Sequence, residues 1–165
     1  KKEKKEKKKR RGPNAIDTVL DEEELRQLKT RVVRQLEGHN YRIASVTFDG
    51  TGEFIASGAW DRTVRVWNVR LGVCVRTFIG HTWGIYRVLY NRQGQLYSAS
   101  GDKTIKLWNP VTGNQIATLA GHRWTVSSIA LNTKGDILAS ASGDKTVRLW
   151  QTGTKGTQLA VLEGH

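Results

Sequence analysis

One pattern of Gly-His, Ser, Asp and Trp is written three times along this chain of 165 residues. Every histidine of the protein follows a glycine, and the histidines recur about every 42 residues, at positions 39, 81, 122 and 165. Within each copy, Asp comes four residues after Ser, and Trp comes six residues after Asp. A period of about forty residues indicates a repeat architecture, in which each unit packs its apolar face against its neighbours.

Each copy also contains the same succession of candidate strands and turns. In the third copy, 121–150, a first strand at about 126–131 is followed by the turn sequence NTKG and a second strand with ILAS. A tight turn at Asp144-Lys145 then leads to TVRLW, where apolar and basic residues alternate with the period of two that is typical of a strand. Four antiparallel strands in about forty residues are typical of a propeller blade.

These three copies resemble the WD-repeat β-propeller family, and the resemblance covers residues 32–165. It implies an all-β fold, a partial WD-repeat β-propeller of three four-stranded blades, with repeats at about 39–80, 81–121 and 122–164. The stretch VVRQLEGH at 32–39 aligns with the end of each copy, so we expect it to be the fourth strand of a blade whose other strands lie elsewhere.

A ring of blades closes on itself, and known propellers typically use four to eight blades. Because Gly164-His165 opens a further copy, we expect this chain to be a fragment of a larger ring. As it stands, it would then expose strand edges and apolar blade faces.

In the family, a His before the first strand, a Ser or Thr in the second strand, the turn Asp and the third-strand Trp form one hydrogen-bonded group. The resemblance assigns these structural tetrads to His39, Ser57, Asp61 and Trp67; His81, Ser98, Asp102 and Trp108; His122, Ser140, Asp144 and Trp150. Each of these polar groups would be costly to bury alone, whereas a joined network holds the turn and the loop of a blade together. The name-giving Trp-Asp ending is Trp-Asn in the first two copies and Trp-Gln in the third.

The resemblance also implies that partners bind where the blade loops meet the central channel, at the third and fifth residues after His and at the residue before the turn Asp. Among these positions, the predicted contact residues are Arg42, Trp60, Tyr86, Thr125 and Ser127. Trp60 is singled out because the other two copies have glycine there, and because Trp, Tyr and Arg dominate interface energetics. The aromatic residues two positions after each His (Tyr41, Trp83 and Trp124) are predicted to pack between blades, with partner contact as the alternative.

The N-terminal part differs in composition from the repeats. Residues 1–13 are predicted to be a disordered basic tail, since 1–11 carry nine basic and two acidic residues and contribute +7 of the net charge of +12. The run is interpreted as a solvated charge segment, a nuclear-import signal or a salt-sensitive nucleic-acid contact. Residues 14–31 are predicted to be a helical linker, with a short helix at 17–30 that is either packed or a partner-docking helix.

Several classes of function are disfavoured. Cys74 is the only cysteine, which excludes an intrachain disulfide and a cysteine-based zinc site, and no apolar run is long enough to span a bilayer. The recurrence of Ser, His and Asp suggests a hydrolase triad, but catalysis needs one such site, and no nucleophile-elbow motif is present. We therefore expect no enzyme activity, cofactor, metal, membrane or small-molecule substrate.

The resulting hypothesis is a non-catalytic scaffold that binds a protein or peptide partner through its propeller face, as a subunit of a larger complex in the nucleus or cytoplasm. One alternative is a substrate receptor of a ubiquitin ligase, although the docking ending Trp-Asp-x-Arg is approached only by WNVR at 67–70. The other is an RNA- or ribonucleoprotein-associated factor, in which nucleic acid would bind only through the tail at 1–11.

Overall fold

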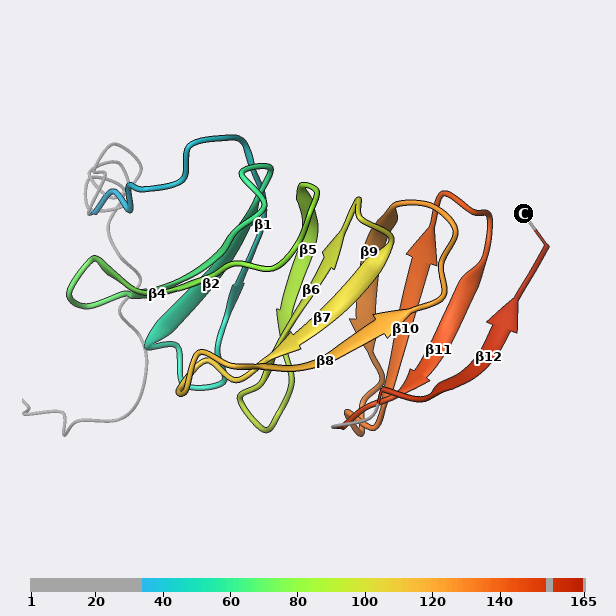
Figure 1. Ribbon diagram of the computed structural model, residues 1–165. Coiled ribbons are helices and arrows are strands. Elements are labelled where there is room, and N and C mark those ends of the chain that lie inside the picture. The colour runs from blue at the N-terminus through green and yellow to red at the C-terminus, as the bar shows by residue number, and fades with distance from the viewer. Residues whose placement is uncertain (1–33, 154–155, 165) are drawn as a thin grey trace, which may run out of the picture. The chain divides into compact units, whose positions relative to one another are not determined.

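The computed structural model describes residues 34–153 and 156–164 of the chain. These residues are all-β: twelve strands form three four-stranded antiparallel sheets, and the described residues contain no helix (Figure 1). No helix long and apolar enough to cross a membrane is therefore found among them. The basic tail at 1–13 and the helix predicted at 17–30 lie outside the described residues, so both stay predictions.

Each sheet is built from four strands that follow one another in the chain, which is the arrangement of a propeller blade. Blade 1 consists of β1 (Ile43–Phe48), β2 (Phe54–Ala59), β3 (Val64–Asn68) and β4 (Val73–Phe78). Blade 2 consists of β5 (Ile85–Tyr90), β6 (Leu96–Ser100), β7 (Thr104–Trp108) and β8 (Gln115–Ala120). Blade 3 consists of β9 (Val126–Leu131), β10 (Ile137–Ser142), β11 (Val147–Gln151) and β12 (Gln158–Leu162).

The three blades share one register. The tetrad serines Ser57, Ser98 and Ser140 lie opposite the third-strand cations Arg65, Lys106 and Arg148. In all three sheets, the pairing of the third and fourth strands shifts immediately before the tryptophan. Equivalent positions of the three copies can therefore be compared directly.

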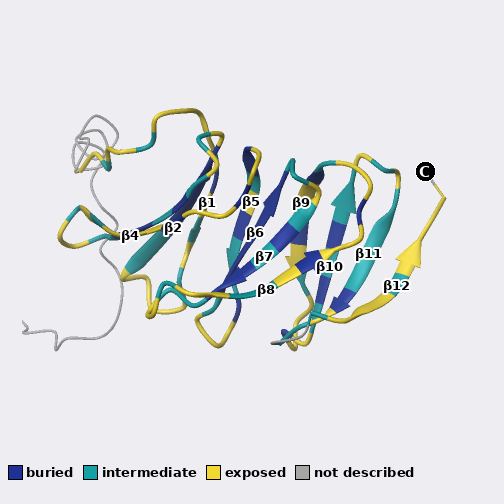
Figure 2. Ribbon diagram, in the orientation of Figure 1, coloured by how far each residue is buried: buried dark blue, intermediate teal, exposed yellow. Residues whose placement is uncertain are grey.

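The core lies between the blades. At the junction of blades 1 and 2, residues of β2, β3 and β4 face residues of β5, β6 and β7, and the buried cluster is Ala56, Val64, Val66, Phe78, Ile85, Val88, Leu96 and Trp108. The junction of blades 2 and 3 is built from the equivalent positions, and its buried cluster is Tyr97, Ala99, Ile105, Leu107, Leu119, Val126, Ile129, Leu138 and Trp150. Blade 2 is consequently the most buried of the three, and its β6 is buried along its whole length (Figure 2).

Two apolar surfaces are not covered by the described residues. Val46 and Phe48 on β1 are exposed, and so are Leu159 and Leu162 on β12 (Figure 2). These surfaces belong to the first and the third blade.

The predicted fourth strand at 32–39 is not seen. Residues 34–38 form no strand, and residues 32 and 33 lie outside the described part. Its equivalents β4, β8 and β12 each pair with the third strand of their own blade, but among the described residues no free third strand lies beside 34–38. Instead, the guanidinium of Arg34 donates to the carbonyls of Val69 and Arg70, so this stretch contacts the loop between β3 and β4.

Candidate functional site

In every blade, the four predicted tetrad side chains are joined by hydrogen bonds. The His and the turn Asp lie at one end of the sheet, which we call the tetrad end, and the Ser and the Trp lie on the second and third strands. The tetrad end comprises the loops before β1, β5 and β9 and the turns after β2, β6 and β10. The His Nδ1 lies 2.7–2.8 Å from an oxygen of the turn Asp, and its Nε2 lies 2.7–2.8 Å from the Ser Oγ. The Trp Nε1 is 2.7–2.8 Å from the same Ser Oγ.

The three hydrogen bonds of each tetrad run in one direction when the imidazole carries its proton on Nδ1. The indole N–H donates to the serine oxygen, the serine hydroxyl donates to Nε2, and Nδ1–H donates to the carboxylate. Every buried donor and acceptor of the group then has a partner, which removes the cost of burying it. We propose that the tetrad has a structural role, in which its hydrogen bonds hold the loop before the first strand against the second and third strands of its blade.

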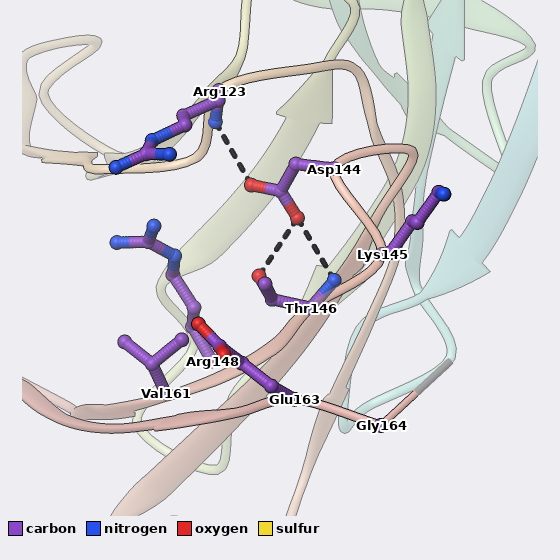
Figure 3. Close-up of a pocket in the computed structure, with 8 residues that line it drawn as sticks. All are labelled: Arg123, Asp144, Lys145, Thr146, Arg148, Val161, Glu163 and Gly164. Carbon is purple, nitrogen blue, oxygen red and sulfur yellow. Dashed lines mark hydrogen bonds between the residues drawn. The ribbon is translucent and has the colours of Figure 1, made fainter.

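The turn Asp accepts two further bonds from a threonine that the sequence reasoning missed. Asp144 Oδ1 accepts the hydroxyl and the backbone N–H of Thr146, and its Oδ2 accepts the backbone N–H of Arg123 at 2.8 Å (Figure 3). Thr63 and Thr104 make the same pair of bonds in the other blades. The signal was available in the sequence, because threonine follows each turn Asp by two residues.

These bonds favour the charged form of the carboxylates. Burial alone would raise the pKa of Asp102, but the bonds from His81 and Thr104 outweigh it and hold that pKa well below its usual range. The pKa of Asp144 is lowered in the same way, against burial, by the backbone N–H of Arg123 and by Thr146. The pKa of Asp61 is also lowered, with Thr63 and His39 as the main partners against burial. All three carboxylates therefore favour the ionised state in the folded chain.

The tetrad has the connectivity of a Ser-His-Asp triad, but its serine is not placed to act as a nucleophile. Ser57, Ser98 and Ser140 are 3%, 0% and 1% exposed, respectively. Each serine oxygen also accepts the indole N–H of its tetrad. A nucleophile must meet a substrate carbonyl beside oxyanion donors, and a buried oxygen held by an indole does not. The geometry thus supports a structural role.

The recurrent tryptophans Trp83 and Trp124 lie on glycines of their own blades. A Cβ added to Gly101 would lie 2.2 Å from Trp83 Cδ1, and one added to Gly143 would lie 2.5 Å from Trp124 Cδ1. The indole two residues after the His therefore packs against the glycine that precedes the turn Asp, where a side chain would clash with it. Both indoles remain 60–62% exposed, and the Lys103 ammonium of blade 2 lies 6.0 Å from the centre of the Trp124 ring of blade 3.

Blade 1 differs, because Trp60 occupies the glycine position. Its ring lies 5.8 Å from that of Tyr86 in blade 2, and the Arg42 guanidinium lies 5.4 Å from the centre of the Trp60 ring. Trp60 is still 43% exposed, and Arg42 is exposed. The structure thus brings three of the five predicted contact residues together, and we call them the Trp60 cluster. They span the junction of blades 1 and 2.

The other two predicted contact residues belong to blade 3. Thr125 is half-buried, and its carbonyl accepts the N–H of Gly143 at 3.0 Å. Ser127 is exposed at the position of Tyr86 in the repeat, and its hydroxyl donates to the carbonyl of Ala141. Their interactions therefore lie within blade 3 rather than in the Trp60 cluster.

Several exposed side chains at the tetrad end are basic. The turn residues Arg62, Lys103 and Lys145 have φ values of 68–74°, and all three are exposed. A cavity of about 570 Å³ beside Asp144 is lined by Arg123, Lys145 and Arg148, together with Glu163 (Figure 3). Since the three turn carboxylates are held in tetrads and almost buried, the charged groups that a partner can contact at this end are mainly the basic side chains. Among the described residues, no cluster of His, Cys, Asp or Glu fits a metal ion.

The four-stranded sheets, each held at one end by a His-Ser-Asp-Trp network, define a β-propeller of the WD-repeat class. The family model described as "WD domain, G-beta repeat" matches residues 30–68, 72–109 and 113–151, which is more than half of the chain. The chain belongs to this family. Proteins of the family act in general as protein-interaction scaffolds without catalysis.

Among curated proteins, the chain is similar to parts of several WD-repeat proteins. It is 45% identical over 49 residues to the small ribosomal subunit protein RACK1 of Caenorhabditis elegans, covering 30% of the chain and 15% of that relative. It is 31% identical over 81 residues to the ribosome biogenesis protein BOP1 homolog of Oryza sativa, covering 48% and 12%. It is 35% identical over 75 residues to the periodic tryptophan protein 2 homolog of C. elegans, covering 45% and 8%. The aligned stretches are thus small parts of these relatives.

Proposed function

We propose that this chain is a scaffold that holds a protein or peptide partner at its tetrad end, within a larger complex. The observation that carries the proposal is the Trp60 cluster. Blades 2 and 3 show that a glycine at position 60 is compatible with the turn, so the tryptophan is not required for it. A half-exposed indole between an arginine and a tyrosine combines the three residue types that supply most interface energy.

The charge at the tetrad end supports a partner segment with acidic residues. Arg42 and the turn residues Arg62 and Lys103 are exposed, and the nearby carboxylates are held inside the tetrads. Attraction of this kind speeds association and weakens with salt. The expected partner therefore presents carboxylates or phosphates around an apolar or aromatic residue.

The substitution Trp60→Gly tests this proposal, because it restores the residue that the other blades carry. Val73→Ala is a matched control, since Val73 is similarly exposed (49%) on β4, at the edge of blade 1. Urea unfolding checks that both variants are folded, because Trp60→Gly also removes the ring contact with Tyr86. In affinity purification with quantitative mass spectrometry, Trp60→Gly should lower partner recovery about tenfold, and Val73→Ala should not. Equal recovery by Trp60→Gly and the parent chain would contradict the proposal.

A second candidate is association with RNA-containing assemblies in the nucleus or the cytoplasm. Two of the similar proteins are named for the ribosome or its biogenesis, and residues 1–11 contribute +7 of the net charge of +12 of this chain. If the run contacts RNA, a chain lacking 1–11 should lose RNA binding, and binding by the full chain should weaken steeply with salt. Binding that survives the deletion would exclude the tail as the RNA contact. For the ubiquitin-ligase alternative we find no support, since Asn68 of the WNVR ending accepts the N–H of Leu71 in its own loop.

A further inference from the structure

A groove of about 850 Å³ lies between blades 1 and 2, at the end of the sheets away from the tetrads. It is bounded by the turns after β1 and β5 and by the loop after β7. Its apolar lining consists of Phe54, Val66, Val75, Tyr90, Pro110 and Val111. A groove of this volume with apolar walls and a few polar groups is typical of a ligand-binding site.

At the next junction, a tyrosine occupies the corresponding place. Tyr97 lies opposite Leu107 in the register of blade 2, just as Ala56 lies opposite Val66 in blade 1. The Tyr97 ring is fully buried in the core between blades 2 and 3. Blade 1 therefore lacks the aromatic ring that its neighbour buries.

The hydroxyl of Tyr97 is buried and makes no hydrogen bond among the described residues. Burial raises the pKa of Tyr97, and the backbone of Gly153 and the side chain of Asn91 oppose the rise. Gly153 and Asn91 are the repeat equivalents of Val111 and Asp49, and both of these residues line the groove. The groove thus lies where the second junction holds a phenol ring.

Tyr90 forms one wall of the groove without closing it. It packs on the core of the first junction but remains partly exposed. Burial, with a smaller contribution from the charge of Asp49, raises the pKa of Tyr90 to about 12, so the wall is a neutral phenol.

The polar groups of the groove favour a negatively charged ligand. The Asp49 carboxylate already accepts the hydroxyl of Thr51 at 2.6 Å and the N–H of Phe54 at 3.1 Å. Arg76 donates one bond to the carbonyl of Val111 at 2.7 Å, and the side chains of Arg76 and Arg92 are exposed. Two arginines against one engaged carboxylate give the groove a net positive charge.

We propose that this groove binds a short acidic peptide segment of a partner protein, with a tyrosine side chain in the apolar cleft and flanking carboxylates near Arg76 and Arg92. The site is separate from the Trp60 cluster, which lies at the tetrad end, so the two proposals stand or fall independently. Burying an aromatic ring supplies the affinity, and the paired charges supply orientation.

The probe is the peptide acetyl-Asp-Tyr-Asp-amide, titrated into the isotope-labelled chain and followed by NMR. Amide signals of the groove turns, such as those of Gly50 and Gly94, should shift together with one dissociation constant. Acetyl-Asp-Ala-Asp-amide should bind at least about tenfold more weakly, because it has no ring to bury. Acetyl-Gly-Tyr-Gly-amide should also bind more weakly, by about fivefold, because it has no carboxylates. Shifts at Trp60 in place of the groove turns would overturn the assignment.

Two exposed valines on β4 provide a matched pair of variants. Val75 lines the groove and is 45% exposed, whereas Val73, two residues earlier on the same strand, is 49% exposed and lies outside the groove. Val75→Glu should weaken the tyrosine peptide about tenfold, and Val73→Glu should change its affinity by less than about twofold. Equal effects of the two substitutions would refute the site. If Val75→Glu does not fold, Arg92→Ala replaces it, with an expected loss of about threefold that disappears at high salt. An unchanged affinity in Arg92→Ala would refute the proposed role of that arginine.

Discussion

Blades 1 and 2 share the same strands and the same tetrad, yet they differ at the residues that surround it. Where blade 2 has Ser100 and Gly101, blade 1 has Ala59 and Trp60. In blade 2, the Ser100 hydroxyl donates to the carbonyl of Gly84 and accepts the N–H of Asp102, and Gly101 receives Trp83. Blade 3 repeats that pattern with Ser142, Gly143 and Trp124. The comparison shows that the blades share the tetrad, whereas the residues beside the turn Asp differ and give each blade a different surface.

The same contrast holds in the core. Ala56 of blade 1 and Tyr97 of blade 2 occupy one position of the repeat, but only the tyrosine fills its junction with an aromatic ring. Blade 1 therefore carries both departures on which the proposed sites depend: an added indole at the tetrad end and a missing phenol towards the other end. Each of the predictions below tests whether the blades differ as this comparison requires.

Acidification should have the largest effect, because it acts on all three blades at once. The folded chain lowers the pKa of each tetrad aspartate, so near pH 4 the unfolded chain binds more protons than the folded chain. The contribution of these aspartates to the free energy of unfolding should therefore be fully present above about pH 5, and it should be lost as the pH falls through the unfolded carboxyl value of about 3.9 towards the lowered folded values. Urea midpoints measured between pH 7 and pH 2.5 check this.

An aspartate variant identifies the source of the acid effect. In Asp102→Asn, one of the three tetrad carboxylates with a lowered pKa is gone, so the loss of stability between pH 5 and pH 3 should be smaller than in the parent chain. Asp61→Asn should reduce the acid loss as well. An acid loss that is identical in both variants and the parent would mean that the tetrads do not cause it.

Removing a tetrad tryptophan should cost more in blade 2 than in blade 1. The Trp108 ring lies 5.3 Å from that of Phe78 in the core of the first junction, whereas Trp67 borders an apolar cavity of about 220 Å³ on the uncovered face of blade 1. Trp108→Ala should lower the free energy of unfolding by about 3–5 kcal/mol, and Trp67→Ala by about 1 kcal/mol less, because a poorly packed site loses fewer contacts. Urea unfolding followed by far-ultraviolet circular dichroism measures both, and equal costs would show that the two faces are equally packed.

The repeats themselves made most of the fold predictable. Because Ser, Asp and Trp recur at fixed spacing around strand-like alternation, the first strand of the third copy was predicted at about 126–131, where the structure has β9. The strand at 32–39 stays a prediction, because it was assigned to a blade whose other strands lie elsewhere and the described residues contain no free third strand with which 34–38 could pair.

The site was less predictable, because contacts across blades leave no local pattern. The packing of indoles on Gly101 and Gly143 depends on the direction in which each tryptophan side chain points. The contacts of Arg42 and Tyr86 with Trp60 depend on side-chain directions in the same way. The groove lies at the first junction of blades, at the place where the second junction holds a phenol ring. It can be recognised only when Ala56 of blade 1 is compared with Tyr97 at the same position of blade 2. Recurrence alone would have revealed the tetrad threonines, which repeat as faithfully as the serines.

The smallest expected effect is a gain, from giving blade 1 the serine that its neighbours carry. Ala59 is fully buried and its N–H donates to the carbonyl of Thr63, as the N–H of Ser142 donates to that of Thr146. A hydroxyl at position 59 would lie next to the N–H of Asp61, as the Ser100 hydroxyl lies next to that of Asp102. Ala59→Ser should therefore stabilise the chain by about 0.5–1.5 kcal/mol, and Ser100→Ala should destabilise it by a similar or larger amount.

The urea midpoints of the two variants measure these changes in stability. A double variant, Ala59→Ser with Trp60→Gly, makes this turn of blade 1 like that of blade 2. If Ala59→Ser stabilises the chain only in the double variant, then Trp60 prevents the hydroxyl at position 59 from making its hydrogen bonds. The exposed indole of blade 1 would then lower the stability of its own turn.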